Sequence, residues 1–181
     1  MKKLVFATLM CVAAMSTKAQ VLTSETVNNV YETVSNQPDS RFVYNVERSG
    51  SDITTMYVYK KAADNKGIET LKPQVKYQYT YAPDSTLSSR VAYRWNDSQA
   101  SWSCTGRLDY SLFPGRYIAE YSRYNLAAGT FDEPVDMMVY TLIPDSTINL
   151  VSSYHRDRPT SRFLLISQVE VNDQPTLFAA K

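Results

Sequence analysis

A spacing that recurs three times along the chain constrains the fold more than any other feature. In each copy a tyrosine is followed by a proline four residues later, an aliphatic residue eight residues later and a second tyrosine fourteen residues later. The copies span residues 79–93, 110–124 and 140–154, so they start 31 and 30 residues apart. A fixed period of this length indicates a supersecondary unit that is repeated and stacked.

Alternation of apolar and polar residues predicts that each repeat is built from β-strands. Tyr77, Tyr79 and Tyr81 alternate with Gln78 and Thr80, which is the period of a strand with two unlike faces. Turn residues recur along the chain with no helical segment between strands, and parallel strands would need long crossovers. The sequence therefore predicts an all-β fold, a single antiparallel meander of about ten strands, strongly twisted or partly closed.

The segment before this region has a different period. Apolar residues recur at i, i+3, i+4 and i+7, which is typical of one face of a helix. These residues are Val27, Val30, Tyr31 and Val34. Thr23 or Ser24 is a suitable N-cap, and we expect a short helix that ends before Pro38.

The repeat also predicts a register for its hairpins. Residue numbers that sum to 170 place Tyr77 opposite Tyr93 and Tyr79 opposite Val91, with the connection at residues 84–86, so that the apolar residues share one face. The same register in the later copies pairs residues as follows: Leu108 with Tyr124, Asp109 with Arg123, Leu142 with Leu150, and Met137 with His155.

The first residues have the order of a signal peptide. Lys2 and Lys3 precede an apolar run from Leu4 to Met15, and Thr17-Lys18-Ala19 supplies a small-x-small cleavage site. We therefore predict a signal peptide over residues 1–19, a helix and linker over 20–40, and an antiparallel β domain over 41–181. The expected location is the periplasm, the cell surface or the extracellular space.

Composition excludes several classes of function. Cleavage after Ala19 would leave 16 basic and 18 acidic residues, with no basic patch of the kind that binds nucleic acid. No later apolar run has the length of about 20 residues that a membrane span needs. The mature chain would keep one cysteine, Cys104, so it could form no internal disulfide.

The sequence offers no motif for catalysis, and we predict no catalytic residue, metal site or cofactor. His155 is the one histidine, which is too few for a Cys/His zinc set, and Cys104 is expected to be a small core residue. Asp109 and Glu120 would face each other across a two-residue turn at Pro114-Gly115, whereas the repeat register pairs Asp109 with Arg123.

Aromatic side chains are the one feature with functional potential. The weak candidates for a binding site are Tyr79, Tyr93, Trp95 and Trp102. Tyr77, Tyr81 and Tyr110 could share their sheet face. Such rings could stack on a sugar or a peptide from an exposed face, or they could form the core of the domain; the sequence leaves both open.

The opening Met-Lys-Lys-Leu, the strands Tyr77-Gln78-Tyr79 and Tyr93-Arg94-Trp95, and Trp102 together resemble small exported proteins of Bacteroides-type bacteria. These proteins form a family of unknown function with tyrosine-rich antiparallel β repeats. The resemblance covers roughly residues 55–171. It implies export and an antiparallel β meander, and it brings no catalytic residue.

These observations lead to an expected function and two alternatives. We expect an exported, non-enzymatic β protein that binds a partner or has a structural role, the partner being a glycan or a protein at the cell surface. The first alternative is a carbohydrate-binding or carbohydrate-active protein that uses an exposed aromatic face. The second is an enzyme whose carboxylates come from separate loops, such as Asp132, Glu133 and Asp136.

Overall fold

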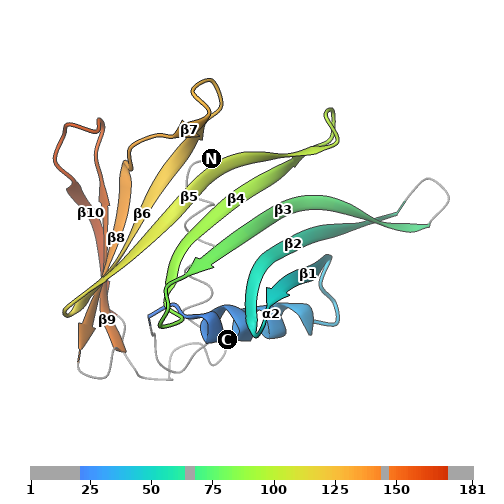
Figure 1. The fold of residues 1–181 in the computed structure, drawn as a ribbon, viewed down its shortest axis with the longest axis horizontal. Coiled ribbons are helices and arrows are strands. Elements are labelled where there is room, and N and C mark those ends of the chain that lie inside the picture. The colour runs from blue at the N-terminus through green and yellow to red at the C-terminus, as the bar shows by residue number, and fades with distance from the viewer. Residues whose placement is uncertain (1–20, 64–67, 144–146, 171–181) are drawn as a thin grey trace, which may run out of the picture. The chain divides into compact units, whose positions relative to one another are not determined.

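The computed structural model describes residues 21–63, 68–143 and 147–170. Ten strands form one open antiparallel sheet in the order β1-β2-β3-β4-β5-β6-β8-β9-β10, and β7 pairs with β6 (Figure 1). The elements are α2 (Ser24–Ser35), β1 (Phe42–Ser49), β2 (Asp52–Ala63), β3 (Glu69–Tyr81), β4 (Leu87–Asn96), β5 (Ser101–Phe113), β6 (Arg116–Asn125), β7 (Thr130–Phe131), β8 (Asp136–Ile143), β9 (Thr147–His155) and β10 (Leu164–Glu170).

The predicted all-β meander of about ten strands is confirmed. The predicted signal peptide lies outside the described residues.

The chain forms two compact units. Of the described residues, the larger unit comprises Leu22–Tyr110 and Glu120–Pro134, and the other comprises Val21, Ser111–Ala119 and residues 135–170. In the larger unit the buried apolar residues include Ile53, Met56, Leu87 and Leu108. In the other unit Tyr117 and Tyr140 are buried, and their ring centroids lie 6.0 Å apart.

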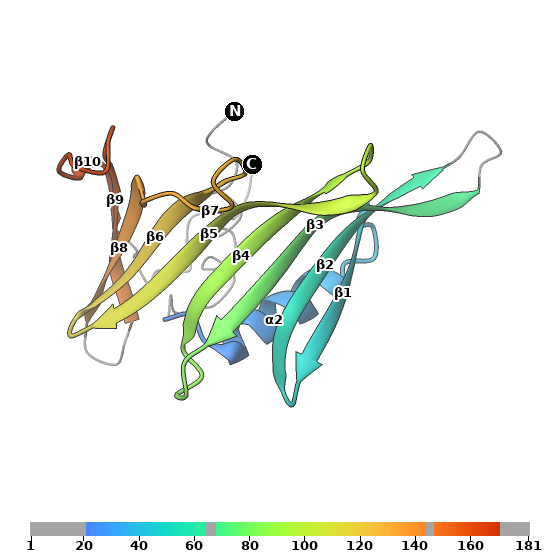
Figure 2. The same ribbon diagram turned by 45° about the horizontal axis from the view of Figure 1, so that its top comes forward.

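The predicted N-terminal helix is confirmed as α2, and it packs beside β1 and β2 (Figures 1 and 2). Thr23 is its N-cap, because the Thr23 side chain accepts a hydrogen bond from the amide of Thr26. The amide of Ser24 donates to the carbonyl of Ser85, 2.9 Å away. The start of the helix is thereby attached to the turn between β3 and β4.

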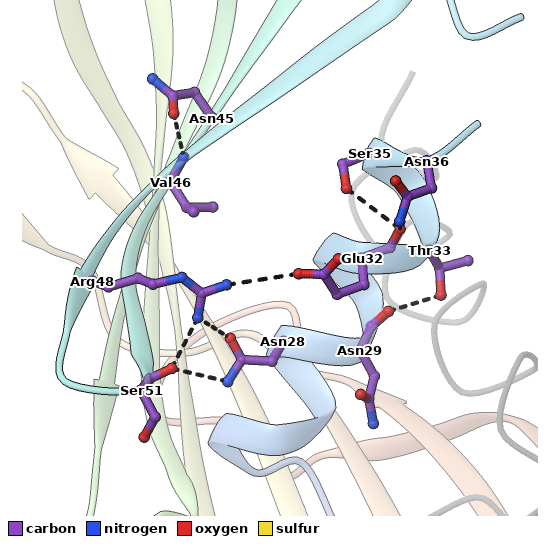
Figure 3. Close-up of polar contacts among 10 residues, drawn as sticks. All are labelled: Asn28, Asn29, Glu32, Thr33, Ser35, Asn36, Asn45, Val46, Arg48 and Ser51. Atoms are coloured by element: carbon purple, nitrogen blue, oxygen red, sulfur yellow. Dashed lines mark hydrogen bonds and ion pairs between the residues drawn. The ribbon is translucent and has the colours of Figure 1, made fainter. Parts of the chain in front are cut away.

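Arg48 joins the helix to the hairpin of β1 and β2. Its guanidinium donates to the side chain of Asn28 and to the carbonyl of Ser51, and it lies 4.0 Å from the carboxylate of Glu32 (Figure 3). The same group lies 5.7 Å from the ring centroid of Tyr31. These contacts place α2 on the sheet face to which Arg48 belongs.

The outer copies of the repeat form hairpins of identical register. Between β3 and β4, Tyr79 lies opposite Arg90, and between β8 and β9, Tyr140 lies opposite Val151. The register shifts at the same point of both copies, after Thr80 and after Thr141. The repeat therefore does specify one hairpin geometry, which confirms the sequence argument from its period.

The register itself was predicted wrongly by one residue. Tyr77 lies opposite Ala92 rather than Tyr93, and Tyr79 opposite Arg90 rather than Val91. In the third copy Leu142 lies opposite Ile148, two residues from the predicted Leu150, because the shift is two residues on the turn side of the bulge and one residue beyond it. The cause is a β-bulge, which adds one residue to β4 at Ser88, and the Ser88 hydroxyl donates to the carbonyl of Thr80 over 2.9 Å.

The connection also differs slightly from the prediction. The amide of Ser85 donates to the carbonyl of Ala82, the amide of Ala82 donates to the carbonyl of Thr86, and Ser85 has a φ of 64°. Residues 83–85 therefore form the loop, instead of residues 84–86. A three-residue loop with its last residue in the left-handed region is a common hairpin connection.

Candidate functional site

The bulge divides the aromatic residues of the larger unit between two faces of the sheet. Residues directly opposite each other in an antiparallel ladder point to the same face. Tyr77 therefore shares a face with Ala92, whereas Tyr93 shares the other face with Lys76. The prediction that Tyr77, Tyr79, Tyr81, Tyr93, Trp95 and Tyr110 share one face is wrong.

The first face carries Arg48 of β1 and is covered in part by α2; we call it the helix face. Tyr77, Tyr79 and Tyr81 lie on it by alternation along β3, and Tyr110 lies on it beside Leu108. Burial raises the pKa of Tyr79 and Tyr81 above the ordinary value of 10.0. The Tyr81 hydroxyl donates to the carbonyl of Ile53 over 2.8 Å. The Tyr79 side chain is half-buried, and its hydroxyl lies 4.0 Å from the sulfur of the buried Met56, so this candidate lies on the helix face, apart from the other three.

Arg90 is a charged residue within this core. Only 8% of its surface is exposed, and its guanidinium carbon lies 4.9 Å from the ring centroid of Tyr77. The register explains its position, because the bulge at Ser88 turns Arg90 toward Tyr79. An arginine can share a buried site with aromatic rings because its planar guanidinium stacks on their faces.

The second face brings the other three candidates together; we call it the open face, since α2, the one helix among the described residues, lies on the helix face. The ladder places Trp95 opposite Trp102 and Tyr93 opposite Cys104. The two tryptophan rings meet edge to face with centroids 5.1 Å apart. Tyr93, Trp95 and Trp102 are all half-buried, so each keeps part of its surface in solvent.

Lys76 and Tyr57 complete this group on the open face. Tyr57, Lys76 and Tyr93 lie in one row across β2, β3 and β4. The Lys76 ammonium nitrogen lies 4.1 Å from the ring centroid of Tyr93 and 5.8 Å from that of Trp102. The ring of Tyr57 lies 6.1 Å from that of Trp102. These five residues, Tyr57, Lys76, Tyr93, Trp95 and Trp102, are called the ring cluster below.

Sequence reasoning missed Lys76 and Tyr57. In the sequence, Lys76 alternates with tyrosines, and this alternation predicts only that one face of the strand is polar and the other is aromatic. The pairing of β3 with β4 would have identified Lys76 as a neighbour of Tyr93, but that pairing depends on the bulge. Tyr57 belongs to β2, outside the repeat, and only the register of β2 with β3 brings it to Lys76.

Cys104 lies in the ladder next to the ring cluster. Its side chain is half-buried, and burial raises the pKa of its thiol above the ordinary value of 9.0. A thiol that holds its proton is a poor nucleophile. This environment is consistent with the expectation of a small packing residue.

His155 lies close to two carboxylates in the other compact unit. Its Nδ1 lies 2.7 Å from the Asp136 carboxylate, and its Nε2 lies 3.8 Å from Asp157. The predicted partner Met137 is wrong, since Asp136 is the residue opposite His155 in the ladder. The difference is the same one-residue shift that separates Tyr77 from Tyr93.

Two of the remaining carboxylate candidates, Asp109 and Asp132, have local polar partners. Asp109 accepts a hydrogen bond from Nε of Arg107 over 2.7 Å, so its ion pair is with a residue of its own strand. Asp132 accepts a hydrogen bond from Nδ2 of the Asn125 side chain over 3.1 Å. Within the described part of the chain, no three His, Cys, Asp or Glu side chains are grouped so that they could hold a metal ion. None of the helices described there has the length and apolarity to cross a membrane.

A comparison with one solved structure agrees with this fold. A protein of unknown function from Bacteroides fragilis is 22% identical, covering 74% of this chain and 94% of its own, with a TM-score of 0.63. A DUF3836 family protein from Parabacteroides distasonis is 20% identical with a TM-score of 0.48, and covers 55% of this chain and 89% of its own. No curated protein matches the chain. The model of the "Family of unknown function (DUF3836)" matches residues 1–142, and the chain therefore belongs to that family.

Proposed function

We propose that this chain is an exported, non-enzymatic protein that binds a partner at the periplasm or cell surface through its open face. The observation that carries the proposal is the ring cluster, in which four aromatic side chains and one lysine lie half-buried on a sheet face opposite the helix. Partly exposed aromatic rings are enriched where proteins bind their partners.

The proposal includes no catalytic activity for this protein. The residues most suited to chemistry are engaged in other contacts: His155 pairs with Asp136, and burial raises the pKa of the Cys104 thiol. Tyr57 donates to the Glu47 carboxylate over 2.9 Å. These contacts support a surface that recognises a partner without transforming it.

Export has a direct test. The full chain would be expressed in a bacterial host and recovered from the cell envelope, and the mass of the mature protein would be measured. Export predicts a mature chain that begins at Gln20. A protein that keeps Met1–Ala19 and stays in the cytoplasm would contradict this part of the proposal.

The binding face has a separate test by oxidative footprinting. The mature protein would be labelled by hydroxyl radicals with and without an extract of the cell envelope. We expect the extract to protect Tyr57, Tyr93, Trp95 and Trp102, while Leu126 in the β6–β7 turn keeps its labelling. Equal labelling of the ring cluster in both samples would contradict the assignment of this face.

A carbohydrate is the second candidate for the partner, and the pair Trp95 and Trp102 favours it. A tryptophan ring that keeps exposed surface offers a flat apolar face to a sugar ring, and because these two rings meet edge to face, the sugar stacks on one of them and borders the other. Screening the mature protein and its Trp102→Ala variant on a glycan array tests this candidate. We expect binding by the native protein alone, and an array without binding would refute the carbohydrate candidate.

A further inference from the structure

Lys76 lies at the centre of the ring cluster. Its neighbours in the ladder are Tyr57 on one side and Tyr93 on the other. The ring of Tyr93 lies beneath the ammonium group at 4.1 Å, and the ring of Trp102 flanks it at 5.8 Å. The rings therefore fix the position of a positive charge on the open face.

The ammonium group of Lys76 has N–H donors that no recorded hydrogen bond in the described part of the chain uses. A lysine ammonium carries three N–H donors and no acceptor. Ring faces attract the cation but accept no conventional hydrogen bond, and the structure records neither a hydrogen bond nor an ion pair for Lys76 among the described residues. Its donors are thus available to a negatively charged ligand.

Other charges near the open face do not supply this partner. Glu47 is held by the Tyr57 hydroxyl, and Asp109 is held by Arg107. The ring cluster contains one cation, Lys76, and the Glu47 carboxylate borders the cluster at the Tyr57 hydroxyl. A ligand that complements it presents a flat apolar surface to the rings and a negative charge to Lys76.

The position of the ring cluster within the sheet disfavours a peptide that binds as an added strand. Such a peptide pairs its main chain with a free strand edge. The ring cluster lies on β2, β3, β4 and β5, and each of these strands has a neighbour on both sides. A saccharide needs no strand edge, because it stacks on rings and bonds to side chains.

We propose that the ring cluster binds a polysaccharide that carries carboxylates, such as one built from uronic acids. A sugar ring stacks on the face of one of the two tryptophans, Trp95 or Trp102, and its carboxylate forms an ion pair with Lys76. This inference rests on the proposed role of the open face and adds the chemical class of the ligand.

The experiment compares an acidic glycan with its neutral counterpart. The full mature protein would be titrated with an oligogalacturonate and with an oligogalactoside of equal length, by calorimetry at low and at high salt. We expect the acidic glycan to bind at least about tenfold more tightly at low salt, and this preference to shrink as salt screens the ion pair.

Variants of Lys76 test the residue itself. Lys76→Met should lose the preference for the acidic glycan while keeping the weaker affinity for the neutral one, and Lys76→Arg should keep the preference. Lys60→Met is the matched control, since Lys60 is an exposed lysine of β2 that alternation places on the helix face. Circular dichroism and thermal unfolding would establish that each variant is folded.

The outcomes separate this inference from the proposed function. Equal affinity for both glycans, or an unchanged preference in Lys76→Met, would overturn the inference and leave a binding role for the open face intact. Equal binding of poly-glutamate would also overturn it, because the charge alone would then suffice. No binding to either glycan would overturn it as well, and failure of the footprinting test would refute the binding face itself.

Discussion

Tyr79 lies directly opposite Arg90 in the ladder between β3 and β4, one residue away from the partner that the repeat suggests. This single relationship determines which side chains of β4 enter the core. Arg90 and Ala92 turn toward the helix face, whereas Val91, Tyr93 and Trp95 turn toward the open face.

Replacing Arg90 should destabilise the larger unit. We expect Arg90→Ala to lower the free energy of unfolding by about 2–4 kcal/mol, because it removes a buried guanidinium from a site shaped by aromatic rings. Urea denaturation would measure the change. Arg94→Ala is the control, since Arg94 is an exposed residue of the same strand, and it should change stability by no more than about 0.5 kcal/mol. Equal effects of the two substitutions would contradict the buried role of Arg90.

Alkaline pH should unfold the protein through its buried tyrosines. Burial raises the pKa of Tyr79, Tyr81 and Tyr110 above the ordinary value of 10.0. The folded state then keeps protons that the unfolded chain releases, so stability is intact below about pH 10 and is lost progressively as the pH rises above it.

Tyrosinate absorbance and circular dichroism, recorded together during a pH titration, would check this expectation. The Tyr110→Phe variant should keep more of its stability above pH 10 than the native protein, because one ionisation is removed. Full ionisation of all tyrosines near pH 10 without loss of structure would contradict the burial of these hydroxyls.

Adding a methyl group at Gly106 should be unfavourable. A Cβ atom there would lie 2.6 Å from the ring of Tyr121 and 2.8 Å from the carbonyl oxygen of Ser122. Because the carbonyl is part of the backbone, we expect Gly106→Ala to cost about 1–3 kcal/mol. Thermal unfolding would measure it, with Ser103→Ala in the same strand as the control. A variant as stable as the native protein would show that β5 and β6 are less closely packed at this point.

Arg48 should be the main polar attachment of α2 to the β1–β2 hairpin. We expect Arg48→Met to reduce stability by about 1–2 kcal/mol, since the contacts to Asn28 and Ser51 are lost. Hydrogen exchange measured by mass spectrometry should become faster in residues 24–35. The exposed Arg41 provides the control, and Arg41→Met should leave exchange in the helix unchanged. Unchanged exchange in Arg48→Met would show that the helix is held by its apolar contacts alone.

The last strand should make the protein prone to aggregation. Leu164 and Ile166 of β10 are 67% and 65% exposed, and β10 is at the end of the strand order. An exposed apolar edge strand is a template for pairing with other chains, and a lysine there opposes such pairing. We therefore expect Ile166→Lys to reduce light scattering during concentration or heating. Leu126→Lys, which changes an 83% exposed residue in the β6–β7 turn, should have a smaller effect; an equal effect would point to net charge as the cause.

Part of the candidate site could be predicted from the sequence. Tyr93, Trp95 and Trp102 were found because alternation and aromatic content are visible in the sequence itself. Tyr79 was assigned to the same group wrongly, since the bulge at Ser88 leaves no clear mark in the sequence: serine is compatible with a regular strand as well as with a bulge. The prediction of a helix capped at Thr23 or Ser24 was correct, with Thr23 as the cap, because capping and helical period are local properties.

The sequence by itself determined the elements of this protein, their antiparallel order and the equivalence of its outer hairpins. These features depend on the period of the side chains and on turn residues, which act over a few positions. Only the tertiary structure decided which residues face each other, because a single extra residue in a strand reverses the direction of every side chain beyond it. That reversal is the physical reason why Lys76, and not Tyr77, lies over the ring of Tyr93.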